Sequence, residues 1–370
     1  MLARVLGPKH SQTSMVRNIP RSPVETLPLC VRELTEQDHA AWDKFVSEHP
    51  HGSPFHLMAW RRSIEETFGF EPQYRLALEG AHIRGVLPMF LVKNLVLGSA
   101  LISVPFATYG GILADTQTVR DALGADAQSL GESLAVGYIE LRNAYLEQCA
   151  GFERISRYAT FVQAVMPDEE ASLRALPANM RSKVRRALKR GFSTRRQTGD
   201  FRAFAGLHAA NYRRLGTPSF PLRHYAALLK NFGDCVDIRE VLLEDRVVAA
   251  SMNFFFRDHV HSFYVASDDR YRRALPNVYL YFDNMRWAGQ NGYRYFDFGR
   301  SKKQSGPYEF KRRWGIVPRE LPYEILLIRR NDLPNFSPAN PRLQMAIRIW
   351  KKIPLPLTRI LGPRLIRLFP

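Results

Sequence analysis

Two stretches of the chain share one pattern, and this internal repeat constrains the fold more than any other feature. Each stretch consists of a strand-like run, a short polar turn and a second strand-like run. The first covers residues 74–94 (YRLALEGAHIRGVLPMFLVKN) and the second covers residues 238–258 (IREVLLEDRVVAASMNFFFRD). Two apolar runs on either side of a tight polar turn are typical of a β-hairpin. The pattern therefore predicts one hairpin in each half of the chain.

The residues after each hairpin predict further strand, then a helix, then another strand. In the first half we expect the helix over residues 119–135 and the strand over residues 138–141. In the second half Pro276, a favourable first-turn residue, begins a helix that runs to about Gln290, and residues 293–298 form the strand. A hairpin followed by β-α-β gives an α/β fold with a mixed sheet. Two copies predict two similar domains.

The repeat divides the chain into four parts. We expect a disordered basic N-terminal tail at residues 1–28, a first domain at 29–170, a second domain at 171–332 and a basic amphipathic C-terminal tail at 333–370. A length of 370 residues accommodates two domains of ordinary size, and 45% hydrophobic residues exclude a globally disordered chain. The formal charge of +18 indicates anionic partners, such as tRNA, nucleotide-linked substrates or an acidic membrane surface.

The cysteines and histidines do not indicate a disulfide framework or a metal site. The three cysteines are far apart and form no CxxC pair, which favours a reducing compartment. His259 and His261 would share one face of a strand, so a metal-binding pair is conceivable, but ordinary strand histidines are the simpler interpretation. No segment reaches the ~18 uninterrupted apolar residues of a membrane span. The N-terminal residues lack the apolar core of a secretory signal, and a transit peptide is the alternative to a tail.

The segment between the two repeats carries a dense positive charge. A helix is expected over residues 179–192, with Asn179 as its cap and Gly191 at its end. Eight basic residues and no acidic residue occur from Arg181 to Arg196. Because unrelieved like charge destabilises a short helix, we expect an anionic partner here. A solvated helix face is the alternative.

The C-terminal residues are also basic and amphipathic. From Pro341 to Pro370 the chain has seven basic residues, no acidic residue and interleaved large apolar side chains. Pro354, Pro356 and Pro363 are expected to divide the segment into short helices. Such a segment either lies on an anionic membrane or packs its apolar face on the body of the protein. The sequence leaves both alternatives open.

The run from Tyr293 to Pro318 (YRYFDFGRSKKQSGPYEFKRRWGIVP) combines a strand, a basic loop and a short helix. The backbone is expected to turn at Gly299 and again at residues 305–307, and a helix over residues 308–314 follows. Loop cations can bind an anionic substrate, and glycines let a ligand approach the backbone. An ordinary solvated turn is the alternative.

This run resembles the C-terminal signature of the FemAB-like proteins, a family of non-ribosomal peptidyltransferases with an acyltransferase fold. It is most similar to the FemAB-like proteins found with exosortase/PEP-CTERM and exopolysaccharide systems of Gram-negative bacteria. Those carry an FGRSK-(Gly-Thr-Gly)-Tyr-x-Phe-Lys-x-x-Trp-Gly run. The matching residues here are Phe298, Gly299, Arg300, Ser301, Lys302, Tyr308, Phe310, Lys311, Trp314 and Gly315. Gln304 and Ser305 depart from it. Further motifs in the family's order extend the resemblance over about Phe55 to Tyr323.

The resemblance implies an α/β fold of two tandem GNAT-like (acyl-CoA N-acyltransferase fold) domains with mixed sheets. It implies an acyl or aminoacyl transferase acting on a cell-wall or exopolysaccharide precursor. Aminoacyl-tRNA or acyl-CoA would be the co-substrate, with no bound cofactor and no metal. The acceptor would be an anionic glycan or a nucleotide- or lipid-linked precursor. The protein would work in the cytoplasm or on the inner face of the membrane, where the C-terminal tail could meet anionic lipid.

The site residues follow from the signature and the nearby charge. We expect Arg300, Lys302 and Lys311 to bind acceptor phosphate, and the assisting or additional substrate-binding residues are Arg181, Lys183 and Asn277. Acyl transfer needs a means of removing a proton from the amine and support for the oxyanion. The catalytic candidates are Tyr271 and Tyr308, as donors to the carbonyl oxygen, and Asp297, as the group that orients the amine. A structural ion pair with Arg300 or Lys311 is the alternative role for Asp297.

One departure from the GNAT pattern keeps the donor open. Acetyl-CoA enzymes of this fold usually have a Q/R-x-x-G-x-G/A loop before a helix, and its backbone N–H groups hold the pyrophosphate. Residues 268–282 (DDRYRRALPNVYLYF) contain no glycine, and Pro276 has no N–H. This makes acetyl-CoA binding in the usual manner doubtful, so an acetyl-CoA-dependent acetyltransferase is only the second hypothesis. A non-catalytic protein that binds a membrane surface or a polyanion is a third.

Overall fold

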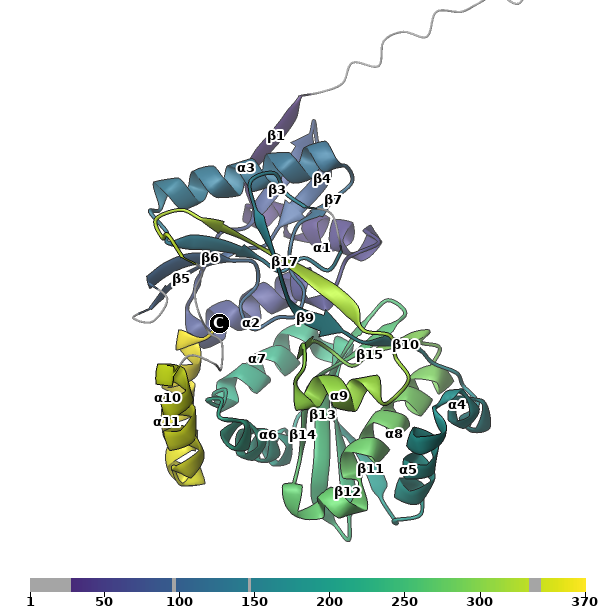
Figure 1. Cartoon of the computed structure of the whole chain (residues 1–370). Helices are drawn as coiled ribbons and strands as arrows, with labels where there is room; N and C mark the ends of the chain where they lie inside the picture. Colours follow the sequence, from purple (N-terminus) through teal and green to yellow (C-terminus); the bar gives the residue numbers. More distant parts are fainter. Residues whose placement is uncertain (1–27, 95–97, 146–147, 333–340) are drawn as a thin grey trace, which may run out of the picture.

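The computed structural model describes residues 28–94, 98–145, 148–332 and 341–370 (Figure 1). Apart from its last residue, the predicted tail at residues 1–28 lies outside these ranges. Up to residue 164 the helices are α1 His39–Glu48, α2 Met58–Phe68 and α3 Gln117–Ser133. The strands of this part are β1 Leu29–Glu33, β2 Glu71–Pro72, β3 Arg75–Glu79, β4 His82–Leu87, β5 Phe90–Asn94, β6 Gly98–Ile102, β7 Leu113–Ala114, β8 Tyr138–Leu141, β9 Glu153–Thr160 and β10 Val162–Ala164.

The remaining residues form a second, similar set of elements. The helices are α4 Glu169–Ala175, α5 Ala178–Leu188, α6 Arg202–Leu215, α7 Leu222–Phe232, the 3-10 helix η4 Asp269–Ala274, α8 Pro276–Gln290, α9 Gly306–Arg312, α10 Pro341–Lys352, α11 Leu355–Leu365 and the 3-10 helix η5 Ile366–Leu368. The strands are β11 Ser193–Gln197, β12 Val236–Leu243, β13 Arg246–Phe256, β14 His259–Ser267, β15 Tyr295–Asp297, β16 Ser301–Lys302 and β17 Arg319–Leu327.

Both halves repeat one order of elements, as the sequence pattern predicted. Hairpin β3–β4 leads through β5 and β6 to α3 and β8, with β6 and β8 parallel. Hairpin β12–β13 leads through β14 to α8 and β15, with β14 and β15 parallel. In the second hairpin Glu244 and Asp245 have φ values of 47° and 64°, the left-handed conformation that a tight two-residue turn requires. The predicted α/β class with mixed sheets is confirmed.

The sheets exchange strands between the two halves. The described strands form sheets in the orders β1-β3-β4-β7, β16-β9-β17-β8-β6-β5-β2 and β10-β15-β14-β13-β12-β11. Strand β10 precedes the boundary predicted at residues 170–171 but pairs with β15 of the second half. Strand β17 follows that boundary but pairs with β8 and β9 of the first half. The division into two domains remains a prediction, and the described sheets cross it in both directions.

Element boundaries differ from the expected ones where a cap decides them. Helix α3 begins at Gln117 because Thr116 caps it, its hydroxyl accepting the N–H of the third helical residue at 3.3 Å. The sequence predicted Asn179 as the cap of the basic helix. This was wrong, because Asn179 lies inside the first turn of α5, which begins at Ala178. Of the three prolines expected to divide the C-terminal segment, only Pro354 lies between two helices, while the other two lie inside α11.

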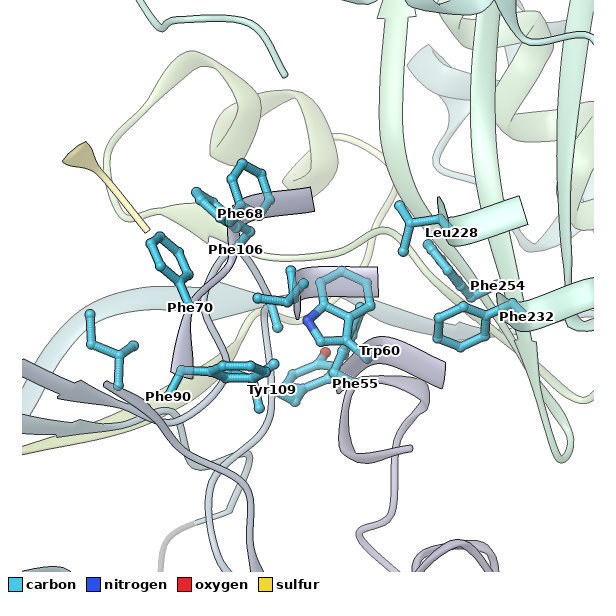
Figure 2. Packing of buried hydrophobic residues seen from close by; sticks show 14 of the residues in the cluster. Phe55, Trp60, Phe68, Phe70, Phe90, Phe106, Tyr109, Leu228, Phe232 and Phe254 are labelled. Carbon is cyan, nitrogen blue, oxygen red and sulfur yellow. The ribbon is translucent and has the colours of Figure 1, made fainter. Parts of the chain in front are cut away.

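The largest hydrophobic cluster is shared between the halves (Figure 2). Phe55 and Trp60 of the first half contact Phe254 of the second, with ring centroids 6.2 and 5.8 Å apart. Helix α2 packs against α7, where Asn231 donates a hydrogen bond to the Ser63 hydroxyl at 3.2 Å. Because one cluster of buried aromatic rings joins both halves, their relative position is set by packing.

Candidate functional site

A cleft opens where β14 and β15 separate. These strands pair in parallel over three residues, from His259 opposite Tyr295 to His261 opposite Asp297. Beyond that point the Phe298 N–H donates instead to the carbonyl oxygen of Phe161, which lies between β9 and β10. The space between the two separated segments is a cleft of about 390 Å³. Residues 262–265 of β14 line one side of it and residues 298–301 line the other.

The amine of Lys311 lies inside this cleft. Lys311 is 6% exposed and projects from α9 towards the turn after β15. Its Nζ donates to the carbonyl oxygens of Gly299 at 2.7 Å and Arg300 at 3.1 Å. Burial lowers the pKa of Lys311 to about 7, although the nearby Asp297 carboxylate opposes that shift. The amine is therefore close to half-neutral at physiological pH, which suits a proton acceptor better than a contact for exposed phosphate.

The guanidinium of Arg300 is held in place behind the cleft. Its Nη1 donates to the Tyr323 hydroxyl at 2.8 Å, and its Cζ lies 4.8 Å from the centre of the Tyr158 ring. Burial acts to lower the pKa of Arg300, but the two tyrosines outweigh it and raise the pKa above its usual value. The group remains cationic and oriented, and it contributes a fixed positive charge to the cleft lining.

Two serines and several aromatic side chains complete the lining. The hydroxyl oxygens of Ser262 and Ser301 are buried and have no hydrogen-bond partner among the described residues. Buried polar groups in proteins are normally hydrogen-bonded, so two unpartnered hydroxyls on residues of one cleft lining are unusual. Aromatic rings and the last residues of the chain contribute much of the remaining lining, among them Phe106, Tyr212, Phe220, Tyr264, Tyr281, Ile366, Phe369 and Pro370.

Asp297 faces the opposite side of β15 from this cleft. Its carboxylate accepts hydrogen bonds from Tyr109 at 2.7 Å, Thr160 at 3.1 Å and the Gly299 N–H at 2.7 Å. The His261 ring lies 3.2 Å away, and no ion pair to Arg300 or Lys311 is present among the described residues. Burial alone would raise the pKa of Asp297, but these hydrogen bonds and His261 lower it to about 2.

One hydrogen-bonded path therefore connects the two faces of β15. The Asp297 carboxylate accepts the N–H of Gly299, and the carbonyl of the same glycine accepts the Lys311 amine. Gly299 has a φ of 72°, which favours glycine. The carboxylate thus holds the turn that positions the amine. The ion pair with Arg300 or Lys311 that the sequence suggested is therefore absent among the described residues, and the role of Asp297 at the attacking amine stays a prediction.

On its own face Asp297 lines a smaller cavity of about 130 Å³. His259, His261, Arg257 and Arg319 line the same cavity. The Arg257 guanidinium donates to backbone carbonyls of the loop after α1, at 2.8 Å for His49. The described residues contain no group of three or more histidine, cysteine or acidic side chains suited to a metal ion. The two strand histidines stack at 5.8 Å and each lies beside an aspartate.

The basic helix does not present all its cations to solvent. Arg181 donates to the carbonyl oxygens of Arg174 and Leu176, both at 3.0 Å, and so holds the end of α4. Lys183 lines a shallow hollow of about 520 Å³ together with Arg312 and Arg313 at the C-terminal end of α9. The structure therefore brings part of the basic helix next to α9, although the two are far apart in the sequence.

The other predicted site residues are spread around this region. Lys302 is exposed on β16, which pairs with β9, while the preceding residue, Ser301, lines the cleft. Tyr308 is partly buried, with its ring 5.2 Å from that of Phe161. Tyr271 lines a separate surface hollow of about 370 Å³. Asn277 lies in the first turn of α8, where its amide oxygen is buried without a partner among the described residues. Of the nine predicted residues, only Arg300 and Lys311 line the cleft.

The sequence did not identify Ser262, Ser301 and the aromatic lining of the cleft. Ser301 lies inside the signature run, and that was the available signal for it. Ser262 lies in a strand with no motif around it. Its position became apparent only because β14 separates from β15 at that residue.

Comparisons with known proteins agree with the fold. Residues 174–312 match the family model for the acetyltransferase (GNAT) domain. No curated protein sequence matches the chain. The solved structure titled FemX is 16% identical, with a TM-score of 0.63 over 81% of this chain and 98% of that chain.

Two other solved structures cover the chain to a similar extent. L-PGS from Bacillus licheniformis is 13% identical, with a TM-score of 0.51 over 82% of this chain and 98% of that one. A tandem GNAT protein from the clavulanic acid biosynthesis pathway is 10% identical, with a TM-score of 0.54 over 81% and 98%. At these identities the similarity is one of fold, and it extends over both halves.

Proposed function

We propose that this acyltransferase, a chain with the FemAB-like tandem GNAT fold, transfers an acyl or aminoacyl group to an amine of an anionic cell-wall or exopolysaccharide precursor. The observation that carries the proposal is the buried amine of Lys311 in the cleft between β14 and β15. A lysine whose pKa lies near 7 can exchange protons at physiological pH. Groups of this kind are typical of sites that perform acid–base chemistry.

On this proposal the transfer uses three groups of the cleft lining. The acceptor nitrogen attacks the carbonyl carbon of the donor ester or thioester, and the carbonyl oxygen gains negative charge. On this proposal the hydroxyls of Ser262 and Ser301, which have no partner among the described residues, rotate towards the cleft and donate to that oxygen. Neutral Lys311 takes the proton from the attacking nitrogen. When the bond from carbon to the leaving oxygen or sulfur breaks, the same amine returns the proton to the leaving group.

Arg300 supports an anionic acceptor. Its guanidinium lines the cleft, carries a permanent charge and is held by Tyr323. A fixed cation attracts a phosphate or carboxylate without the loss of side-chain freedom that a surface lysine would incur. On this proposal Lys302, which is exposed beside the cleft, adds long-range attraction.

The donor is either an aminoacyl-tRNA or an acyl-CoA. The hollow lined by Lys183, Arg312 and Arg313 favours a polyanion on the surface next to the cleft. The absence of glycine before α8 disfavours the usual pyrophosphate contact of acetyl-CoA. We therefore favour aminoacyl-tRNA, used in the cytoplasm or at the inner face of the membrane, where such precursors are made.

A donor panel tests the proposal. The purified protein is incubated with a phosphate-bearing amino-glycan precursor and, in turn, with aminoacyl-tRNA and acetyl-CoA, and the products are analysed by mass spectrometry. We expect an added aminoacyl mass with tRNA. Turnover only with acetyl-CoA, together with a large thermal shift on adding it, would establish the acetyltransferase alternative. Salt-dependent binding of tRNA without turnover of either donor would contradict the proposal and support a binding protein.

A further inference from the structure

The two C-terminal helices, α10 and α11, expose an apolar surface although they are packed on the body of the protein. Trp350 of α10 is buried and its Nε1 donates to the Thr217 carbonyl at 3.1 Å. The Arg213 Nε donates to the Ile353 carbonyl, between the two helices, at 2.6 Å. One face of the helix pair is therefore anchored beside α6. In Figure 1 the pair, in yellow, lies at the edge of the molecule.

The other face carries large apolar side chains in contact with solvent. On α10, Met345 and Ile349 are four residues apart and are 65% and 57% exposed. On α11, the exposed apolar residues share a single helical stripe, and they are Leu357, Ile360 and Leu361. These five make up more than half of the large hydrophobic residues that are exposed in the described part of the chain. Such a concentration on a protein surface usually marks an interaction site.

Basic side chains accompany this apolar stripe, and no acidic residue does. From residue 341 to the end of the sequence as given, there is no aspartate or glutamate. Arg348, Lys352 and Arg364 are exposed, and none of them forms an ion pair with an acidic residue of the described chain. Cations that flank an exposed apolar stripe match the interface of an anionic bilayer, where the apolar side chains enter the acyl region and the cations meet the headgroups.

The same segment borders the cleft. Residues Ile366 and Phe369, which follow α11, line the Lys311 cleft, as does Leu215 at the end of α6. Leu215 is itself 45% exposed. The apolar surface and the cleft lining are therefore continuous along the chain from α11 through η5. No helix of the described chain is long and apolar enough to cross a membrane. Contact from one side is the mode of binding that fits this surface.

We propose that α10 and α11 dock the protein on an anionic membrane surface and thereby present the cleft to acceptors held at that surface. Docking itself is independent of the reaction catalysed. The second clause rests on the proposed function, because it assigns the acceptor to the lipid-linked class. Within that class, the phosphate of the precursor would lie at headgroup depth, and its amine would reach Lys311 from the membrane side.

Vesicle co-sedimentation of the full chain tests the docking. We expect binding to vesicles that contain phosphatidylglycerol, weak binding to phosphatidylcholine alone, and release by salt. Replacing Arg348, Lys352 and Arg364 together by glutamine should weaken binding about a hundredfold, since each surface cation contributes roughly fivefold. Ile349→Glu combined with Ile360→Glu should abolish binding, because both substitutions place a charge in the apolar stripe.

A matched variant removes three exposed cations from α5 and its C-cap, on the opposite edge of the molecule, namely Arg185→Gln, Arg186→Gln and Lys189→Gln. This variant should bind vesicles nearly as well as the original protein. Equal loss of binding in both charge variants would overturn the proposal, because binding would then depend on net charge alone. So would a dimer in sedimentation velocity that Ile349→Glu and Ile360→Glu dissociate, since a second copy would then cover this face.

Turnover separates this proposal from the proposed function. Variants that fail to bind vesicles should still modify a water-soluble precursor, while their activity on the lipid-linked form should fall with binding. Vesicle binding without any turnover would refute the proposed function and leave docking intact. Turnover with no vesicle binding would refute docking alone.

Discussion

At the scale of single residues, Lys311 and Asp297 form one unit although Lys311 belongs to α9 and Asp297 to β15. The carboxylate holds the Gly299 turn, and the carbonyls of that turn hold the amine. The amine loses hydration on burial, and the negative charge of Asp297 partly compensates for that loss. A buried lysine with carbonyl partners but no paired carboxylate is costly for folding, which is typical of functional sites.

Replacement of Lys311 distinguishes proton transfer from anion binding. If neutral Lys311 accepts the proton, the rate should rise with pH through about 7, because the amine is protonated below its pKa. Lys311→Met and Lys311→Arg should then both lower the single-turnover rate by about 10²–10⁴-fold, since arginine stays protonated. Substantial activity in the arginine variant would indicate that the charge, rather than the proton acceptor, is required.

The same substitution has an expected effect on stability. Because the pKa of Lys311 is lowered on folding, the unfolded state binds the proton more tightly, and the folded state gains stability as pH rises from about 7 towards the usual lysine range. Lys311→Met removes this penalty, so we expect a Tm equal to or higher than that of the original protein at pH 7. Calorimetry over a pH series from neutral to mildly alkaline should show the difference between the two proteins shrinking as pH rises.

Asp297 is predicted to act as a positioning residue through its charge. Asp297→Asn keeps an acceptor for the Gly299 N–H but removes the negative charge that favours the protonated amine. The midpoint of the pH–rate profile should therefore move to lower pH. Thr160→Val is the matched control, because it removes one hydrogen bond to the carboxylate and leaves the charge. A midpoint that shifts equally in both variants would point to a general disturbance of the turn.

At the scale of elements, the cations of the basic helix α5 lie in two separate environments. Arg181 holds the C-terminal carbonyls of α4, whereas Lys183 shares a hollow with Arg312 and Arg313 of the α9 region. The density of charge in the sequence suggested one anion-binding segment. The helix phase divides it, because residues two apart on a helix do not face the same direction.

Two substitutions on α5 should distinguish the predicted nucleic-acid contact of Lys183 from the stabilising contact of Arg181. Lys183→Gln should weaken tRNA binding and reduce the slope of log affinity against log salt by about one unit, because the variant neutralises one phosphate fewer. Arg181→Gln should instead lower Tm, with an unchanged salt slope, since its guanidinium caps backbone carbonyls within the protein. Filter binding over a range of salt, together with thermal melts, measures both effects. A salt slope that changes in the Arg181 variant would place its side chain at the nucleic acid.

At the scale of the whole molecule, the halves are joined by strand exchange and by a shared core. Strand β10 completes the second-half sheet and β17 completes a first-half sheet. Trp60 and Phe232, from the two halves, lie 6.3 Å apart in the same aromatic cluster (Figure 2). Neither half can lose its structure without exposing the buried surface of the other. We therefore expect cooperative unfolding of the chain despite its two repeated units.

Truncation of a side chain in this shared core tests that expectation. Phe232→Ala should destabilise the protein by about 3–5 kcal/mol, the usual cost of removing a buried phenylalanine, and unfolding should remain a single calorimetric transition. Two transitions, of which only the second-half one moved, would show that the halves unfold independently. Exposed Leu222 on the same helix is the control, because its replacement by alanine leaves no cavity.

Local sequence determined the elements and the class of the fold. Two hairpins, α8 and strand β8 were predictable because alternating apolar residues, a left-handed turn and an N-terminal proline act within a few residues. The signature run likewise placed Arg300 and Lys311 together in the chain. What it could not show was their environment: the burial that lowers the pKa of Lys311 and the tyrosines that hold Arg300 come from other segments.

Only the tertiary structure decided which strands complete which sheet, where the cleft opens, and which side of it Asp297 faces. Those features depend on pairings between residues far apart in sequence, such as Tyr109 with Asp297 or β17 with β8. Local preferences do not specify such pairings, since strands of similar composition can pair with one another in several orders. The sequence alone thus determined a repeated α/β chain with a basic signature loop, and long-range packing made that loop one side of a cleft with a buried amine.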